Sequence, residues 1–169
     1  MAEEDTVLQN LITRDQMFSL MECADGKAHL IGEGFTDLSE SKGAKEYTRK
    51  YVSYKTEVTD VIGFAPSISY SCDVISGDPV VKEIIDITDN EKTGADAHRN
   101  IITVNGWEEQ TEPGKYKAYR RKYAVIPDSK GSGTEALIYT GTFKARGDLE
   151  PGVFDTATKT FTPNSTPAA

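Results

Sequence analysis

The feature that most constrains the fold is a strict alternation of side chains between Pro66 and Val74. Apolar residues occupy every second position and small polar residues fill the positions between them: Ile68, Tyr70, Cys72 and Val74 against Ser67, Ser69, Ser71 and Asp73. Successive side chains of a β-strand point to opposite faces. The pattern therefore predicts a strand with one face in a core and the other on a polar surface.

Other segments show strand signals of the same kind, rich in Tyr, Thr, Ile and Val and bounded by Gly, Pro, Asn or Asp. A hairpin is expected around the Asp25-Gly26 turn, with strands at 17–23 and 28–35. Three later strands are expected at 101–107, at 116–126 with its end at Pro127, and at 134–146.

A single helix is predicted after Gly77. Asp78 is placed as its N-cap and Pro79 as its first residue, a common start for a helix. The following apolar residues recur mainly at three- and four-residue spacing and form one stripe: Val80, Val81, Ile84, Ile85 and Ile87. The fold class is therefore mainly β, a β-sandwich or small barrel of about seven strands with one helix.

Three segments are expected to lie outside the central domain at 15–147. Residues 1–14 read as a polar N-terminal arm, and residues 148–169, rich in Pro and Thr, as a flexible tail. Within the domain, 36–65 is interpreted as a long insertion: a loop at 36–46 followed by a β-prone segment at 47–61. Long excursions of this kind often carry function.

The formal charge of −8 argues against ordinary binding to a nucleic-acid backbone, which requires clustered Lys and Arg. One basic and aromatic segment runs from Lys115 to Tyr123. Such a strand is suited to bind single-stranded nucleic acid by stacking and charge, but the net acidity opposes this. We expect its charges to pair with acidic residues of a neighbouring copy. No stretch is apolar enough for a membrane span or a signal sequence, so synthesis in the cytoplasm is expected. Cys23 and Cys72 are predicted to be reduced, buried thiols.

The residues carry no catalytic or metal-binding pattern. His29 and His98 lie in no recognisable motif, and no GxSxG is present. Asp86, Asp89 and Glu91 lack the spacing of a calcium loop and are interpreted as a solvated helix end. We therefore expect no enzyme activity and no cofactor.

Three stretches resemble the major tail tube proteins of long-tailed, siphovirus-like bacteriophages: 31–39 (IGEGFTDLS), 63–70 (GFAPSISY) and 77–80 (GDPV). The resemblance covers roughly residues 15–147. That family is related in fold to the tube proteins of contractile tails and of type VI secretion. The resemblance implies a structural subunit of the virion tail, made in the bacterial host.

The resemblance also implies a set of partners. Copies of the chain are expected to form hexameric rings, which stack around a tape measure protein and end at tail terminator and tail tip proteins. Genomic DNA is expected to pass through the lumen without specific binding. Within this picture, the insertion residues Tyr47, Tyr51 and Tyr54 are candidates for contacts between rings, because tyrosine buries area at little entropic cost.

Carboxylates that line a lumen repel DNA phosphates, which gives the net acidity a role. The candidates for the lumen wall are Glu22, Glu33, Asp60 and Asp73. Two alternatives remain open. One is another virion component, a tail terminator, a connector or a decoration protein. The other is a β-sandwich module that binds a ligand through Trp107, Tyr116 and Tyr119.

Overall fold

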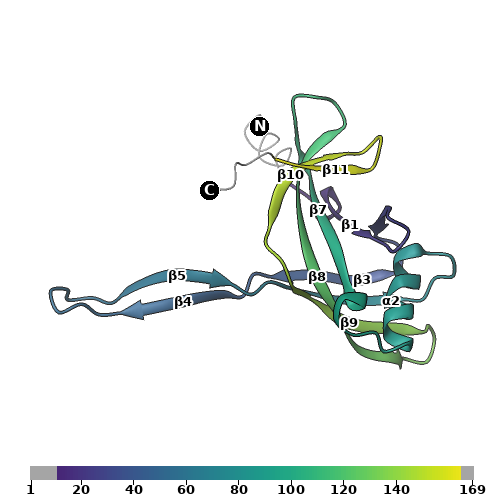
Figure 1. Cartoon of the computed structure of the whole chain (residues 1–169), viewed down its shortest axis with the longest axis horizontal. Helices are drawn as coiled ribbons and strands as arrows, with labels where there is room; N and C mark the ends of the chain where they lie inside the picture. Colours follow the sequence, from purple (N-terminus) through teal and green to yellow (C-terminus); the bar gives the residue numbers. More distant parts are fainter. Residues whose placement is uncertain (1–10, 165–169) are drawn as a thin grey trace, which may run out of the picture. The chain divides into compact units, whose positions relative to one another are not determined.

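The computed structural model describes residues 11–164 (Figure 1). Within this range strands predominate, and the one α-helix is α2 (Pro79–Asp89), accompanied by the short 3-10 turns η1 (Arg14–Gln16) and η2 (Gly94–Ala97). The chain divides into two compact units. The strand β8 (Lys115–Ser132) contributes its first part to one unit and its second part to the other. The prediction of a mainly β fold with one helix is confirmed.

Unit 1 comprises residues 11–32, 100–121 and 148–164 of the described chain. Its strands, besides the start of β8, are β1 (Met17–Glu22), β2 (Ala28–Ile31), β7 (His98–Glu109), β10 (Glu150–Asp155) and β11 (Thr160–Pro163). The hydrogen-bonded order is β2–β1–β7–β8, and β10 pairs with both β8 and β11. Apolar side chains from four of these strands form the core: Leu20, Ile102, Val104, Ala118 and Phe154. The predicted hairpin is confirmed as β1–β2, with Gly26 in its turn.

Unit 2 comprises residues 33–99 and 122–147. Its sheet has the order β8–β9–β6–β3, with β3 (Phe35–Ser41), β6 (Ser67–Asp73) and β9 (Ile138–Ala145). The alternation that opened the sequence is confirmed in β6, where Ile68, Tyr70 and Cys72 are buried. The Tyr70 ring stacks on Phe143 of β9 with centroids 4.5 Å apart.

The helix α2 belongs to unit 2 and starts as predicted. The Asp78 side chain accepts hydrogen bonds from the backbone N–H groups of Val80 and Val81, at 2.9 and 3.3 Å. The buried face of the helix carries four of the five residues in the predicted stripe: Val80, Val81, Ile84 and Ile87. At its other end Asp89 accepts from Lys130 of β8 at 2.7 Å and from the Tyr139 hydroxyl of β9 at 3.1 Å.

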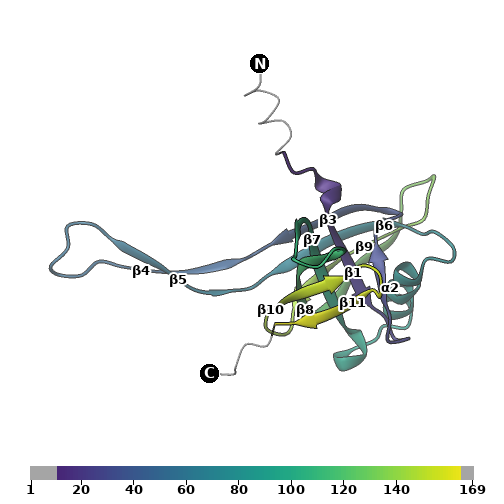
Figure 2. The same cartoon turned by 90° about the horizontal axis from the view of Figure 1, so that it is seen from above.

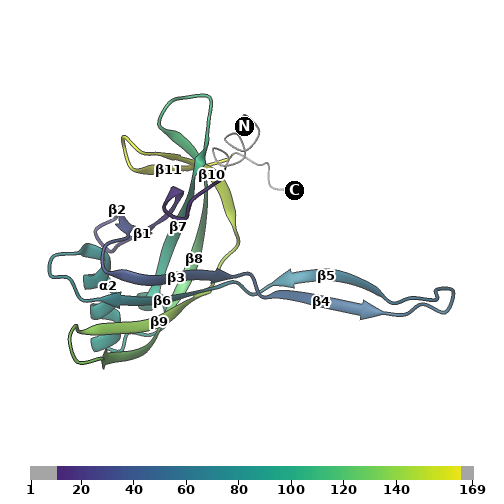
Figure 3. The same cartoon turned by 180° about the vertical axis from the view of Figure 1, so that it is seen from behind.

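A second, two-stranded sheet projects from unit 2 (Figures 2 and 3). It consists of β4 (Ala44–Arg49) and β5 (Val58–Phe64), and we call residues 44–64 the arm. The prediction of a loop at 36–46 was wrong, because β3 and the start of β4 occupy it. The single β-prone segment at 47–61 contains two strands and a turn. Most residues of β3 and all residues of β4 are exposed, so neither strand shows the alternation of apolar and polar residues that marks a half-buried strand.

Two further predictions require correction. Pro127 does not end its strand, because β8 continues to Ser132 with Pro127 opposite Gly141 and a register shift beside it. Proline is tolerated at such an irregularity. The predicted flexible tail at 148–169 instead contributes β10 and β11, and Phe154 of β10 is buried in the core of unit 1. The predicted N-terminal arm at 1–14 lies mostly outside the described residues.

In the range 11–164 we find no helix with the length and hydropathy that a membrane crossing requires.

Candidate assembly surface

The arm is an ordered ribbon without a core. All six residues of β4 are exposed, and so are five of the seven in β5. Its large side chains are open to solvent, with exposed fractions between 39% and 109%: Tyr47, Tyr51, Val52, Tyr54, Val61, Ile62 and Phe64. Many exposed large apolar side chains on one projecting element are typical of a surface that binds another protein.

Local contacts fix the tyrosines on which the ring-contact prediction rests. Tyr51 and Tyr54 meet edge to face at the turn, with ring centroids 5.7 Å apart, and the Tyr54 N–H donates to the Tyr51 carbonyl at 3.0 Å. The Arg49 guanidinium lies over the Tyr47 ring at 5.0 Å. The structure thus places all three predicted tyrosines on the arm. Their proposed contact with another copy stays a prediction.

The arm joins the body of unit 2 at Gly43. This residue has a φ of +54°, and a Cβ atom built on it would lie 2.4 Å from the carbonyl oxygen of Ala65 on the opposite strand. The Ala65 N–H donates to the Gly43 carbonyl at 3.0 Å. Only glycine accommodates both the left-handed backbone and this close approach without strain.

The four predicted lumen carboxylates do not form one group. Glu22, at the end of β1, accepts from Asn100 at 2.9 Å and forms an ion pair with Arg120 at 3.3 Å. Asp60 lies on the arm, opposite Tyr47. Glu33 and Asp73 belong to the same end of unit 2, where the Asp73 N–H donates to the Gly34 carbonyl at 2.8 Å. Whether any of the four faces a lumen stays a prediction.

The predicted polar surface of β6 extends across three strands of unit 2. Residues with short hydroxyl side chains are paired across these strands. Ser69 of β6 lies between Ser39 of β3 and Thr142 of β9, and Ser71 of β6 lies opposite Thr140 of β9. We call this surface the hydroxyl face: Ser39, Ser41, Ser67, Ser69, Ser71, Thr140 and Thr142. The sequence predicted two of its three strands, β6 and β9, but a loop in place of β3.

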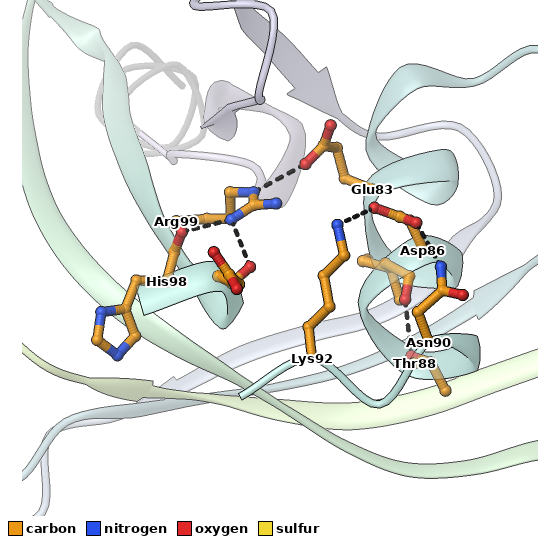
Figure 4. Close-up of polar contacts among 9 residues, drawn as sticks. Glu83, Asp86, Thr88, Asn90, Lys92, His98 and Arg99 are labelled. Carbon is orange, nitrogen blue, oxygen red and sulfur yellow. Dashed lines mark hydrogen bonds and ion pairs between the residues drawn. The ribbon is translucent and has the colours of Figure 1, made fainter. Parts of the chain in front are cut away.

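A polar cluster fixes the chain that leaves α2 (Figure 4). Arg99 donates to Glu83 at 2.8 Å and to the carbonyls of Asp96 and His98 at 3.0 and 2.7 Å. The ammonium group of Lys92 contacts Asp86 and lowers the pKa of this carboxyl below its usual value. The helix end predicted to be solvated is therefore held by ion pairs, and its acidic groups have cationic neighbours.

Two cations of the basic segment of β8 are paired within unit 1, whereas Nε and Nη1 of Arg121 are buried without a hydrogen-bond partner among the described residues. Arg120 pairs with Glu22 and with Glu150, the latter at 2.7 Å, and its guanidinium covers the Phe161 ring at 4.9 Å. Lys115 forms an ion pair with Glu112. The prediction that these cations pair with acidic residues of another copy was wrong for Arg120 and Lys115, which pair within the chain.

The residues that would serve a ligand-binding module do not share an exposed face. Tyr116 packs against the buried cluster of unit 1, whereas Tyr119, three positions along the same strand, belongs to the opposite face. An open hollow of about 350 Å³ in unit 1 is lined mainly by the polar side chains of Gln110, Thr111, Glu112, Lys115, Asp155, Thr160 and Thr162. It contains none of these aromatic residues.

Within the described part of the chain no three His, Cys, Asp or Glu side chains are grouped as metal ligands. Cys23 and Cys72 are buried thiols that form no disulfide within the described residues, as predicted. Burial raises the pKa of the Cys72 thiol to about 11, so it is protonated and weakly nucleophilic at neutral pH.

Comparison with known proteins gives a likeness to solved structures. No protein-family model matches the sequence, and no curated protein matches it. A chain in the cryo-electron microscopy structure of the anti-feeding prophage baseplate, sixfold symmetrised, aligns with a TM-score of 0.48 and 10% identity. The alignment covers 83% of the present chain and 94% of that chain. A likeness of this size carries no conclusion about function.

Proposed function

We propose that this chain is a tail tube subunit of a long-tailed bacteriophage, a structural protein without catalytic activity. In this proposal six copies form a ring, and rings stack around a tape measure protein between a tail terminator and tail tip proteins. The protein is made in the host cytoplasm and ends in the tail of the virion. The resemblance of 31–39, 63–70 and 77–80 to that family supplies the specific identity.

The observation that carries the proposal is the coreless arm. A two-stranded ribbon is marginally stable in water unless its side chains pack against something else. The arm exposes Val52 completely and Tyr51, Tyr54 and Phe64 by about half, at 109%, 47%, 53% and 60%. Burying such side chains contributes roughly 1.5–3 kcal/mol each for fully covered aliphatic or aromatic groups. A repeated subunit provides that cover on every copy.

The hydroxyl face supports the passage of DNA. Proteins that retain DNA do so mainly through Lys and Arg at phosphates. Serine and threonine side chains on this face are short and uncharged, and Lys144, opposite Ser67, is the cation next to them on β9. A wall of this composition gives a polyanion few groups to bind. We propose the hydroxyl face as lumen lining.

Negative-stain electron microscopy of the concentrated full-length chain tests the proposal. We expect hollow tubes of stacked rings, with a matching high-mass species in sedimentation velocity. The triple variant Y51S/V52S/Y54S is expected to keep the circular dichroism spectrum of the wild type and to lose the tubes. The Leu149→Ser variant removes an exposed apolar side chain of unit 1, outside the arm and the β3–β6 ladder, and should leave them intact.

Two other outcomes would redirect the interpretation. Single rings that never stack would favour a tail terminator or connector, the second virion role that a β-rich subunit with an arm can fill. A wild-type chain that stays monomeric at all concentrations, also in the presence of tape measure protein, would refute the tube proposal.

A further inference from the structure

The two ends of one β-ribbon in unit 2 carry opposite charge. Strands β3 and β6 form an antiparallel ladder from Phe35–Cys72 to Ser41–Ser67, and beyond the second end they lead into the arm. The turn of the arm is basic, and the far end of the β3–β6 ladder is acidic. We infer that the arm turn of one copy docks on the acidic end of the β3–β6 ladder of a second copy. This inference rests on the proposed function.

The basic end consists of the arm turn, residues 50–57, together with Arg49 at the end of β4. It contains Arg49, Lys50 and Lys55 against one carboxylate, Glu57, in a chain whose formal charge is −8. Arg49, Lys50 and Lys55 form no ion pair with any residue of the described range. They lie close in sequence to the exposed Tyr51 and Val52, so the turn combines apolar side chains with a net positive charge.

The acidic end consists of Glu33, Asp37 and Asp73. Asp37 lies opposite Ser71 near the start of the β3–β6 ladder, and Asp73 follows two residues later along β6. Glu33 precedes Gly34, whose carbonyl accepts from the Asp73 backbone at 2.8 Å. No Lys or Arg of the described residues forms an ion pair with these three carboxylates. Glu40, Glu83, Asp86 and Asp89 of the same unit, in contrast, each form an ion pair.

Distance along the ribbon makes pairing within one copy unattainable. From Asp37 to Lys50 the chain runs through β3 and β4, about 40 Å of extended strand. The basic and acidic ends therefore satisfy each other only between copies. A contact between two different patches is heterologous, and repeating it without closure builds an open stack. The inference assigns Asp73 and Glu33 to this contact rather than to the lumen wall.

The contact is expected to depend on salt. Exposed charges interact over about 8 Å at 0.15 M salt and about 3 Å at 1 M. The critical concentration for tube formation should therefore rise with NaCl. A nucleic acid is the other class of ligand that a basic and aromatic turn could bind. We favour a second copy because the complementary acidic patch lies on the same ribbon of every copy.

Charge reversal on the full-length chain tests the inference by sedimentation and negative-stain microscopy. Variant K50E/K55E reverses the arm turn, and variant D37K/D73K reverses the acidic end. Each variant alone should raise the critical concentration at least about tenfold, because like charges then face each other. Mixed in equal amounts, the two variants should assemble together, since each supplies the patch that the other lacks.

The control is K82E/K159E, which changes the net charge as much as K50E/K55E at two other exposed lysines. It should assemble like the wild type. Circular dichroism and thermal melting of every variant verify that the body remains folded. A variant that does not fold is replaced by the single changes Lys50→Glu and Asp37→Lys.

The failures of the two proposals are distinguishable. If wild-type tubes form but K50E/K55E assembles equally well, the docking inference is overturned and the tube proposal stands. The same holds if K50E/K55E loses only the ability to retain a DNA duplex while tubes are unchanged. If the mixture of the two variants fails to assemble although K82E/K159E does, direct pairing of the two ends is overturned. A wild-type chain that never assembles refutes both.

Discussion

Replacing Gly43 with alanine should release the arm from its joint. Gly43 has a φ of +54°, and the new Cβ would lie 2.4 Å from the Ala65 carbonyl oxygen, closer than any real Cβ contact. A left-handed conformation costs an L-residue roughly 1–2 kcal/mol. Relieving the clash requires the strands to part and breaks the 3.0 Å bond from the Ala65 N–H to the Gly43 carbonyl, at about 1 kcal/mol.

Together these costs are about 2–4 kcal/mol, with the upper value covering the displacement of the backbone. The change is local, because Gly43 and Ala65 are both exposed. Amide hydrogen exchange measures this local destabilisation directly. Because each 1.4 kcal/mol corresponds to a factor of ten, the protection factor of the Ala65 amide should fall about 30- to 700-fold. The urea midpoint of the body should move little, and tube formation should weaken.

Gly63→Ala is the matched control. Gly63 lies in β5 of the same arm, opposite Lys45, and a Cβ built on it meets no atom within 4 Å. Its substitution should be neutral or slightly stabilising, since alanine restricts the unfolded chain more than glycine does. If G43A keeps the wild-type protection at Ala65, or if G63A is equally damaging, the steric account of the joint is refuted.

Three further predictions concern unit 2. Asp78→Ala should destabilise the protein to urea by about 1 kcal/mol through loss of the helix cap, whereas Asp78→Asn should retain most of the cap; equal losses would contradict the capping role. Cys72, with its pKa raised to about 11, should resist thiol reagents in the native state at pH 8 and react in urea. Because the folded pKa exceeds the usual 9.0, stability is complete below pH 9 and falls as pH rises through 11; Cys72→Ala should show less of this alkaline loss. Lys130 and Tyr139 lower the pKa of Asp89, so its contribution is present above the usual 3.8 and lost as pH falls through the lowered value; Asp89→Asn should flatten the acid limb of the urea midpoint against pH.

The sequence predicted those elements that bury one face. The alternation at 67–73 identified β6, and Asp78 with Pro79 identified the start of α2, because burial and capping leave direct signatures in residue order. The same logic missed β3 and β4. Their residues are exposed on most positions, and their register is set by pairing with β6 and β5, which a single sequence does not display.

Other elements were hidden by glycine and proline. In β10 the two buried positions are Gly152 and Phe154, so the inward face shows a single large apolar side chain. Pro151 in β10 and Pro127 in β8 read as strand breakers although both lie within ladders. The candidate site was predicted in part: the tyrosines of 36–65 lie on the arm, but the hydroxyl face and the acidic end required the strand pairing.

The division of β8 between two units constrains the order of events during synthesis. Strand β1 has no long-range partner until β7 has been made, and the outer edge of β8 in unit 1 stays open until β10 follows. Unit 2 likewise stays incomplete until residues 122–147 have been synthesised. Pairings at such sequence separation make folding slow. The arm is a local hairpin, and its residues are synthesised well before those that complete the body. Its exposed apolar side chains are therefore present on the nascent chain before the rest of the subunit has folded.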